Sequence, residues 1–265
     1  MRLSVILKKA SLVGAFFVSV VCSAQALALC STSERLQPVA VAKVIDGDTL
    51  RLADGRSVRL IGLNTPEMGR QGRATEPYAK EARQRLQQLV DASGRKIGLR
   101  PGEQATDRYG RLLAHVYDAR GNNLEAALLA DGLGYFVAIS PNTELVACHQ
   151  AAERRARLAA RALWGKQPVK PARSLERGGF ALVSGQVQRV DRNRGGVWLQ
   201  LDGPLVLQVP AKALREFEAS LRRIQPGTRV EVRGWVVDRR SRDGRRDRAP
   251  WLLPVTHPSM LNVQR

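Results

Sequence analysis

The strongest constraint on the fold is a set of three short apolar runs that lie close together early in the chain. Residues 39–45, 49–52 and 57–63 are rich in β-branched and aliphatic side chains, and the gaps between them contain Asp46-Gly47 and Asp54-Gly55. Runs of this length, separated by Asp-Gly turns, are typical of consecutive antiparallel strands. We therefore expect the fold to begin with a meander of strands.

Helical and strand signals then alternate up to about residue 165. Four apolar residues recur at helical spacing after Pro77: Ala79, Ala82, Leu86 and Leu89. Further strands are expected at 97–99 and 112–116, and further helices at 124–130 and 144–163. Five or so strands with three helices predict a small closed barrel capped by helices.

A second domain is expected after residues 166–178, a stretch rich in proline and charge that is typical of a linker. The linker would separate a first domain at 27–165 from a second at 179–265. Strand-like runs return at 181–190, 197–201, 205–209, 230–237 and 251–255. A helix expected at 211–223 falls between the third and fourth of these strands, which is the order of an OB-like barrel.

The first 26 residues have the layout of a secretory signal peptide. A basic start precedes the apolar run 10–21, and small residues offer cleavage after Ala26 or Ala28. The alternative is a membrane anchor, although the apolar run is short for a span. Cleavage predicts a periplasmic or secreted protein without a membrane span.

Signal cleavage would leave two cysteines, Cys30 and Cys148. In an oxidising compartment, an even pair is expected to form one disulfide, here between the mature N-terminus and a later helix. The alternative is two separate thiols.

The net charge of +19 indicates a polyanionic partner, either nucleic acid or an anionic membrane surface. Most of the excess lies in residues 166–265, which contain 20 Lys and Arg against 9 Asp and Glu. The arginine-rich run 239–248, together with Trp198, Trp235 and Trp251, favours nucleic-acid binding by the second domain. The alternatives are a solvated arginine loop and tryptophans that belong to the core.

Three clusters contain residues suited to phosphodiester hydrolysis. The first is Asp46-Gly-Asp48-Thr49, which is a weak signal alone because Asp-Gly turns are common. The second is the apolar run 58–63, which contains Arg59 and leads directly into the segment Asn64-Thr65-Pro66-Glu67. An arginine within an otherwise apolar strand needs an anionic partner. The third is the turn 106–112, which places Arg111 at the start of a strand.

These residues have compatible chemical roles. Arg59 and Arg111 can neutralise a phosphate as negative charge develops on it. Three groups supply hard oxygen ligands of the kind calcium binds: the Asp48 carboxylate, the Asn64 side chain and the Thr65 carbonyl. Glu67 can accept a proton from water. No Cys or His spacing suits zinc; His115 and His149 are expected to be structural, and no role is assigned to His257.

The blocks Asp-Gly-Asp-Thr, Arg-Leu-Ile-Gly-Leu-Asn-Thr-Pro-Glu and Thr-Asp-Arg-Tyr-Gly-Arg, in this order, resemble the thermonuclease (staphylococcal-nuclease-like) family over about residues 39–165. The resemblance implies an OB-type five-stranded barrel with three helices. It also implies a calcium-dependent endonuclease that acts on DNA and RNA and leaves 3′-phosphate ends. The roles it implies are calcium binding by Asp48 and Thr65, phosphate contacts by Arg59 and Arg111, and a base or water-orienting role for Glu67.

The sequence departs from the family pattern in two places. The family's second calcium aspartate is Asn64 here, so the site keeps an oxygen but loses a charge. Ala138 stands where family nucleases often have a tyrosine that packs on the nucleotide, and Tyr135 and Phe136 are the candidates to replace it. Arg108 and Tyr109 are the other expected substrate contacts.

The predicted fold class is therefore mainly β with α (α+β), an OB-type five-stranded barrel with three helices followed by a second, small OB-like barrel. The predicted function is that of a monomeric, calcium-dependent nuclease for DNA and/or RNA, with no identifiable protein partner. The alternative is a catalytically inactive nucleic-acid-binding protein. All four charged residues needed at the phosphate are nevertheless present: Asp48, Arg59, Glu67 and Arg111.

Overall fold

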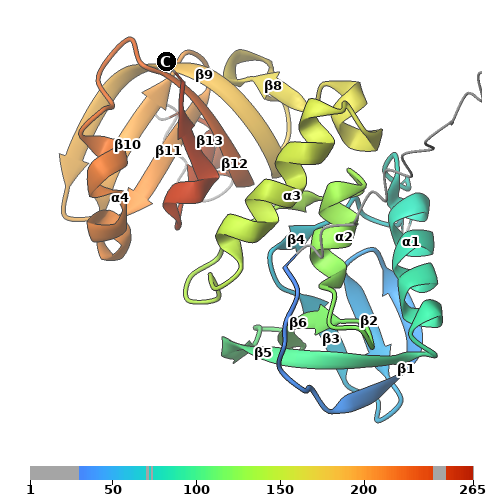
Figure 1. Ribbon diagram of the computed structural model, residues 1–265. Coiled ribbons are helices and arrows are strands. Elements are labelled where there is room, and N and C mark those ends of the chain that lie inside the picture. The colour runs from blue at the N-terminus through green and yellow to red at the C-terminus, as the bar shows by residue number, and fades with distance from the viewer. Residues whose placement is uncertain (1–29, 70–71, 73, 241–248, 265) are drawn as a thin grey trace, which may run out of the picture.

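The computed structural model describes residues 30–69, 72, 74–240 and 249–264. Its first half is a closed barrel in the order β1-β2-β3-β6-β5 (Figure 1). The strands are β1 (Pro38–Asp46), β2 (Thr49–Leu52), β3 (Ser57–Leu60), β5 (Lys96–Thr106) and β6 (Leu112–Tyr117). Strands β1, β2 and β3 pair antiparallel in sequence, so the predicted meander and the predicted closed barrel are both confirmed.

Three helices accompany this barrel in the described residues: α1 (Ala79–Ala92), α2 (Leu124–Ala130) and α3 (Val146–Leu158). The last of them is shorter than the helix expected at 144–163. It ends because Ala160 and Ala162 have positive φ angles, of 47° and 42°, which an α-helix cannot contain. In Figure 1, α3 lies between the first barrel and the second.

A small two-stranded sheet, formed by β4 (Leu63–Asn64) and β7 (Tyr135–Phe136), was not expected from the sequence. The strands are antiparallel, with Leu63 opposite Phe136 and Asn64 opposite Tyr135. This sheet matters because β4 immediately follows the barrel strand of Arg59 and leads into the site residues 64–67.

The second half contains a further barrel, whose ring runs β9-β10-β11-β13-β12 and closes through pairing of β12 with β9. Its strands are β9 (Gly179–Asn193), β10 (Gly196–Leu201), β11 (Leu205–Pro210), β12 (Arg229–Asp238) and β13 (Trp251–Pro254). Helix α4 (Leu214–Leu221) lies between β11 and β12 in the chain, as the OB-like order predicts.

Two outer strands extend this second sheet: β8 (Val169–Pro171), which pairs parallel with β9, and β14 (Leu261–Val263), which pairs antiparallel with β12. β8 lies inside the stretch 166–178 that was expected to be a linker. The connection between the barrels is therefore partly built into the second sheet.

The expected disulfide joins Cys30 to Cys148, with the two Cα atoms 5.7 Å apart. It ties the segment before β1 to α3. The signal peptide expected at 1–26 lies outside the described residues, and so does most of the arginine-rich run, at 241–248. In the part of the chain that is described, no helix has the length and apolarity needed to cross a lipid bilayer.

A buried polar network joins α2 to α3. Asn123 caps α2 by accepting a hydrogen bond from the Ala126 N–H at 2.8 Å, and its Oδ1 lies 3.0 Å from His149 Nε2. Because that oxygen is an acceptor, Nε2 of His149 must be the donor. His115 and His149 are both buried, as expected for structural histidines. Burial, together with the nearby His115, lowers the pKa of His149 to about 3.

This lowered pKa predicts acid sensitivity. Below pH 6.5 the unfolded chain protonates His149 while the folded chain resists, so stability present at neutral pH is lost as pH falls towards 3. At pH 4 the loss from this group should be roughly 3 kcal/mol. Denaturant unfolding at pH 7 and pH 4 should show that the free energy of unfolding decreases less in His149→Gln than in wild type. The glutamine amide can still donate a hydrogen bond to Asn123. Equal losses in the two proteins would contradict the assignment.

Candidate active site

The first site cluster is formed where β2 and β3 meet β4. Thr49 of β2 is paired with Arg59 of β3, and Asp48 lies one residue before that strand pair. Arg59 forms an ion pair with Asp48 Oδ1 and donates from Nη2 to Asn64 Oδ1 at 3.2 Å. The predicted anionic partner of Arg59 is therefore Asp48, and the structure brings Asn64 to the same guanidinium.

The Asp48 carboxylate is held by hydrogen bonds on both oxygens. Its Oδ2 accepts from the backbone N–H of Thr65 at 2.9 Å and from the Thr65 hydroxyl at 3.1 Å, and its Oδ1 accepts from the Thr49 hydroxyl at 3.1 Å. Asp48, Asn64 and Thr65 are all buried. These bonds fix the orientation of Asp48 relative to β4.

Gly47 makes this close approach of the two loops possible. A Cβ atom at position 47 would lie 2.7 Å from the Ala82 Cβ and 2.8 Å from the Thr65 side chain. Any larger residue would therefore push the turn away from α1 and from Thr65. The Asp-Gly pair is needed here for packing as well as for the turn.

Arg59 is a buried cation among several charges. Burial lowers its pKa to about 10, Asp46, Glu67 and Asp107 act in the opposite direction, and Arg111 adds to the lowering. Arg59 is thus still charged at neutral pH. Glu67 and Arg111, the other two residues expected to be catalytic, both act electrostatically on the Arg59 guanidinium.

Arg111 is positioned by Asp107, for which the sequence predicts no role. Asp107 Oδ2 accepts from Arg111 Nε at 2.7 Å, and Asp107 Oδ1 accepts from the backbone N–H groups of Tyr109 and Arg111 at 2.9 and 3.0 Å. Partial burial opposes ionisation of Asp107, but these hydrogen bonds keep its pKa below the usual value. The signal in the sequence is the spacing of four residues between Asp107 and Arg111.

Tyr109 presents an aromatic ring beside Arg111. It is 69% exposed, whereas the other three tyrosines are half-buried or buried. Arg108 Nη2 donates to its hydroxyl at 2.7 Å, and the Cζ atoms of Arg108 and Arg111 lie 4.8 and 5.6 Å from the ring centroid. An exposed ring flanked by two guanidinium groups can stack on a nucleobase while the arginines contact phosphate.

Glu67 is exposed and stands at the rim of the site. Its backbone N–H donates to Glu76 Oε2 at 3.0 Å, and its carbonyl accepts from the Glu76 N–H at 3.0 Å. These two bonds fix the backbone that follows Pro66. The exposed Glu67 can therefore contact solvent water.

Tyr135 and Phe136 were the two candidates to replace the nucleotide-packing tyrosine that is Ala138 here. Phe136 and Ala138 are fully buried, so the idea that Phe136 contacts the nucleotide is wrong. Tyr135 is half-buried, and its ring lies 5.7 Å from the rings of both Phe180 and Trp164. It packs towards the second barrel.

Two of the three oxygen groups expected to bind calcium lie at the same guanidinium. Asp48 and Asn64 both direct a side-chain oxygen at the Arg59 guanidinium, so the two oxygens lie close together around one positive charge. A carboxylate and an amide oxygen next to Thr65 suit a hard cation. Among the described residues, no cluster of three or more His, Cys, Asp or Glu side chains is placed to hold a metal ion.

The tryptophans of the second barrel divide into core and surface. Trp251 is buried, in agreement with the alternative that it belongs to the core, and Trp198 is half-buried with its Nε1 bonded to Asn193 at 3.0 Å. Trp235 is 40% exposed. Its ring packs edge-on against Phe180, with the centroids 5.1 Å apart, so the side chain is exposed in part.

Comparison with known proteins gives a family match that begins at β3 and ends after α3. The sequence profile of the family described as staphylococcal nuclease homologue matches residues 57–166. Endonuclease YncB of Bacillus subtilis is 30% identical over 137 residues, which cover 50% of this chain and 64% of that protein. The thermonuclease of Staphylococcus hyicus is 30% identical over 131 residues, covering 48% of this chain and 76% of the relative.

Two further relatives are similar over shorter shares of their length. The SPbeta prophage-derived endonuclease YokF of Bacillus subtilis is 29% identical over 137 residues, covering 50% of this chain and 46% of that protein. The thermonuclease of Staphylococcus intermedius is 36% identical over 90 residues, covering 33% of this chain and 52% of the relative. The chain thus spans less than two thirds of the length of endonucleases YncB and YokF.

Proposed function

This chain belongs to the staphylococcal nuclease family, and we propose that it is a secreted or periplasmic, calcium-dependent endonuclease for DNA and/or RNA. The observation that carries the proposal is the set of charges around the buried Arg59, which pairs with Asp48 and interacts electrostatically with Arg111 and Glu67. Two arginines with fixed carboxylate partners, next to oxygen ligands and an exposed carboxylate, suit the hydrolysis of a phosphodiester.

The two arginines would bind the scissile phosphate. Arg59 is buried and Arg111 is held by Asp107, so both guanidinium groups need little reorganisation when charge develops on the phosphoryl oxygens. Arg108 and Tyr109 would contact the substrate beside them. Glu67 would orient the attacking water or take its proton, and the product would carry a 3′-phosphate.

Calcium, when bound, would supply Lewis-acid stabilisation of the phosphoryl oxygens. Asp48, Asn64 and the carbonyl of Thr65 would hold it. Two features support this ligand set: the convergence of the Asp48 and Asn64 oxygens and the burial of all three residues. With one carboxylate among them, calcium binding should be weak, because the affinity of such sites follows the charge of the ligands.

Replacing Asn64 by Asp should strengthen calcium binding, since it adds a second carboxylate to the set. We expect the calcium dissociation constant, measured by calorimetry, to fall about tenfold, and the calcium concentration for half-maximal cleavage to fall with it. Asn262→Asp is the matched control, because it makes the same change of charge at an exposed position of the second barrel. Equal dissociation constants for wild type and Asn64→Asp would refute the ligand role of residue 64.

Cleavage of four substrates decides between the nuclease and an inactive binding protein. Single- and double-stranded DNA and RNA would each be incubated with the full-length protein in calcium and then in chelator. The proposal expects cutting in calcium only, with ends that a polymerase extends after phosphatase treatment. Tight binding without cutting would support the alternative.

The second barrel, residues 179–265, is proposed to grip the nucleic acid. Its support is the excess of basic residues and the exposed ring of Trp235. Under this proposal the protein is a monomer with a nuclease domain at 27–165, and the two barrels contact one substrate molecule. Substrate binding should then weaken steeply as salt is raised.

A further inference from the structure

Within the part of the chain that the structure describes, strand β7 has a neighbouring strand, β4, on one side only. Phe136 is opposite Leu63 of β4, and the flanking Val137 N–H donates to the Gly62 carbonyl at 3.1 Å. In an antiparallel pair, alternate residues direct their N–H and C=O groups towards the partner strand, so those of Phe136 face away from β4. Phe136 is fully buried, and buried backbone groups need hydrogen-bond partners.

An ion pair satisfies both backbone groups of Phe136. Glu153 of α3 accepts from the Phe136 N–H at 2.8 Å, and Arg233 of β12 donates from Nη1 to the Phe136 carbonyl at 3.1 Å. The same Nη1 lies 2.7 Å from both oxygens of Glu153. The two side chains are almost buried, at 11% and 7% exposure. Together they take the place of a third strand beside β7.

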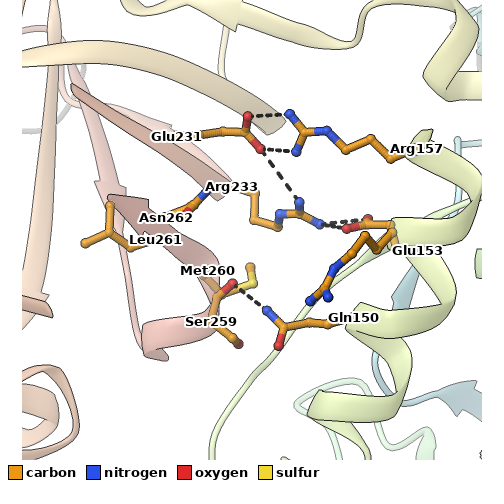
Figure 2. Close-up of a pocket in the computed structure, with 10 residues that line it drawn as sticks. Gln150, Glu153, Arg157, Glu231, Arg233, Ser259, Met260, Leu261 and Asn262 are labelled. Atoms are coloured by element: carbon orange, nitrogen blue, oxygen red, sulfur yellow. Dashed lines mark hydrogen bonds and ion pairs between the residues drawn. The ribbon is translucent and has the colours of Figure 1, made fainter. Parts of the chain in front are cut away.

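One half of this ion pair comes from the second barrel. Figure 2 shows Arg233 reaching from the second barrel to Glu153 on α3, beside a cavity of about 260 Å³ between the two halves. Met260 of the second barrel also contacts the segment after β7, since its Sδ accepts from the Ala138 N–H at 3.2 Å. The segment 136–138 is thus held by β4 on one side and by the second barrel on the other.

The opposite strand carries the site. Asn64 lies in β4, and the next residue, Thr65, holds the Asp48 carboxylate with its N–H and its hydroxyl. We propose that Arg233 is a positioning residue of the nuclease site, which acts through β7 on β4. This inference rests on the proposed function, and it makes the second barrel part of the catalytic unit as well as a binding module.

Arg157 provides a matched control. It pairs with Glu231 of β12 through two hydrogen bonds of 2.6 and 2.7 Å, so it crosses the same contact between α3 and β12. Within the described residues, it donates to no backbone group of β7. A loss of contact between the barrels should therefore follow from either replacement, whereas displacement of β4 should follow only from loss of Arg233.

The test compares Arg233→Met, Arg233→Lys and Arg157→Met in the full-length, disulfide-bonded protein. Amide hydrogen exchange of peptides covering 60–66 and 134–139 is expected to be about tenfold faster in Arg233→Met and within about twofold of wild type in Arg157→Met. Arg233→Lys keeps the charge on a shorter side chain and should give an increase of about threefold.

Cleavage kinetics supply the second readout. At saturating calcium, kcat of Arg233→Met should fall about tenfold while KM changes less than about threefold, because ground-state contacts with the substrate are intact. Arg233→Lys should recover most of this loss, and Arg157→Met should keep wild-type kcat. If both methionine variants show the same exchange and the same kcat, the proposal is overturned.

Folding and the proposed function are checked separately. If Arg233→Met does not fold, as judged by circular dichroism, the comparison uses Arg233→Lys, and wild-type exchange in that variant overturns the proposal. A wild-type protein that cuts none of the four substrates would refute the nuclease function. The exchange comparison would still decide whether Arg233 holds β4 in place.

Discussion

Replacing Arg59 or Arg111 by alanine is expected to lower kcat for phosphodiester cleavage by about a thousandfold or more. Each arginine would bind the phosphate more strongly as negative charge develops on it in the transition state, so the loss should appear mainly in kcat. Arg59 contributes from a buried position beside Asp48, where a guanidinium is weakly screened by solvent. Arg111 contributes from a turn in which Asp107 fixes its orientation.

Arg56→Ala is the control for this prediction. Arg56 immediately precedes β3, but its side chain is exposed and, among the described residues, forms an ion pair only with Asp54, two residues before it. Cleavage by Arg56→Ala should stay within about twofold of wild type, as expected for a surface ion pair. Circular dichroism and thermal unfolding would establish that Arg59→Ala remains folded. Retention of wild-type kcat in either site variant would remove that arginine from the mechanism.

Removing the disulfide is expected to have the largest effect on stability. The bond joins residues 118 positions apart, and a loop of that size corresponds to a stabilisation of about 5 kcal/mol through restriction of the unfolded chain. The Cys30→Ser, Cys148→Ser double variant should therefore unfold at a much lower denaturant concentration. The bond also ties α3 to the N-terminal segment, and α3 contains both His149 and Glu153.

The measurement is denaturant unfolding of wild type with and without reductant, next to the double variant. Reductant should lower the stability of wild type to that of the double variant and leave the variant unchanged. If reduction of wild type lowered the free energy of unfolding by less than about 1 kcal/mol, the unfolded chain would have to retain structure that already brings the two cysteines together.

The predictions for the two arginines and for the disulfide came from the sequence, whereas the one for Arg233 did not. Arg59 could be found because a guanidinium in an apolar run stands out against its neighbours. Arg233 also lies in a strand rich in valine, but basic residues are so frequent in residues 166–265 that a further arginine does not stand out. Glu153, its partner, is 80 positions away and lies in a helix rich in charge.

Asp107 is an intermediate case. Asp107 lies four residues before Arg111, in the block 106–111 that resembles the family pattern. The sequence does not say whether a carboxylate in such a turn binds the substrate, a metal ion or a neighbouring residue. The structure decides this, because Asp107 accepts hydrogen bonds from three groups within its own turn. Its oxygens are thereby committed to Arg111 and Tyr109.

The sequence by itself determined the elements whose signals are local. Strand runs with Asp-Gly turns, helical periodicity and the two mature cysteines predicted a barrel with three helices, a second barrel and one disulfide. Only the tertiary structure decided how β4 and β7 pair, because two-residue strands are too short to have a pattern. It also decided that an arginine of the second barrel completes the edge of β7. The physical reason is that buried backbone groups take their partners from whatever the fold brings near, at any separation along the chain.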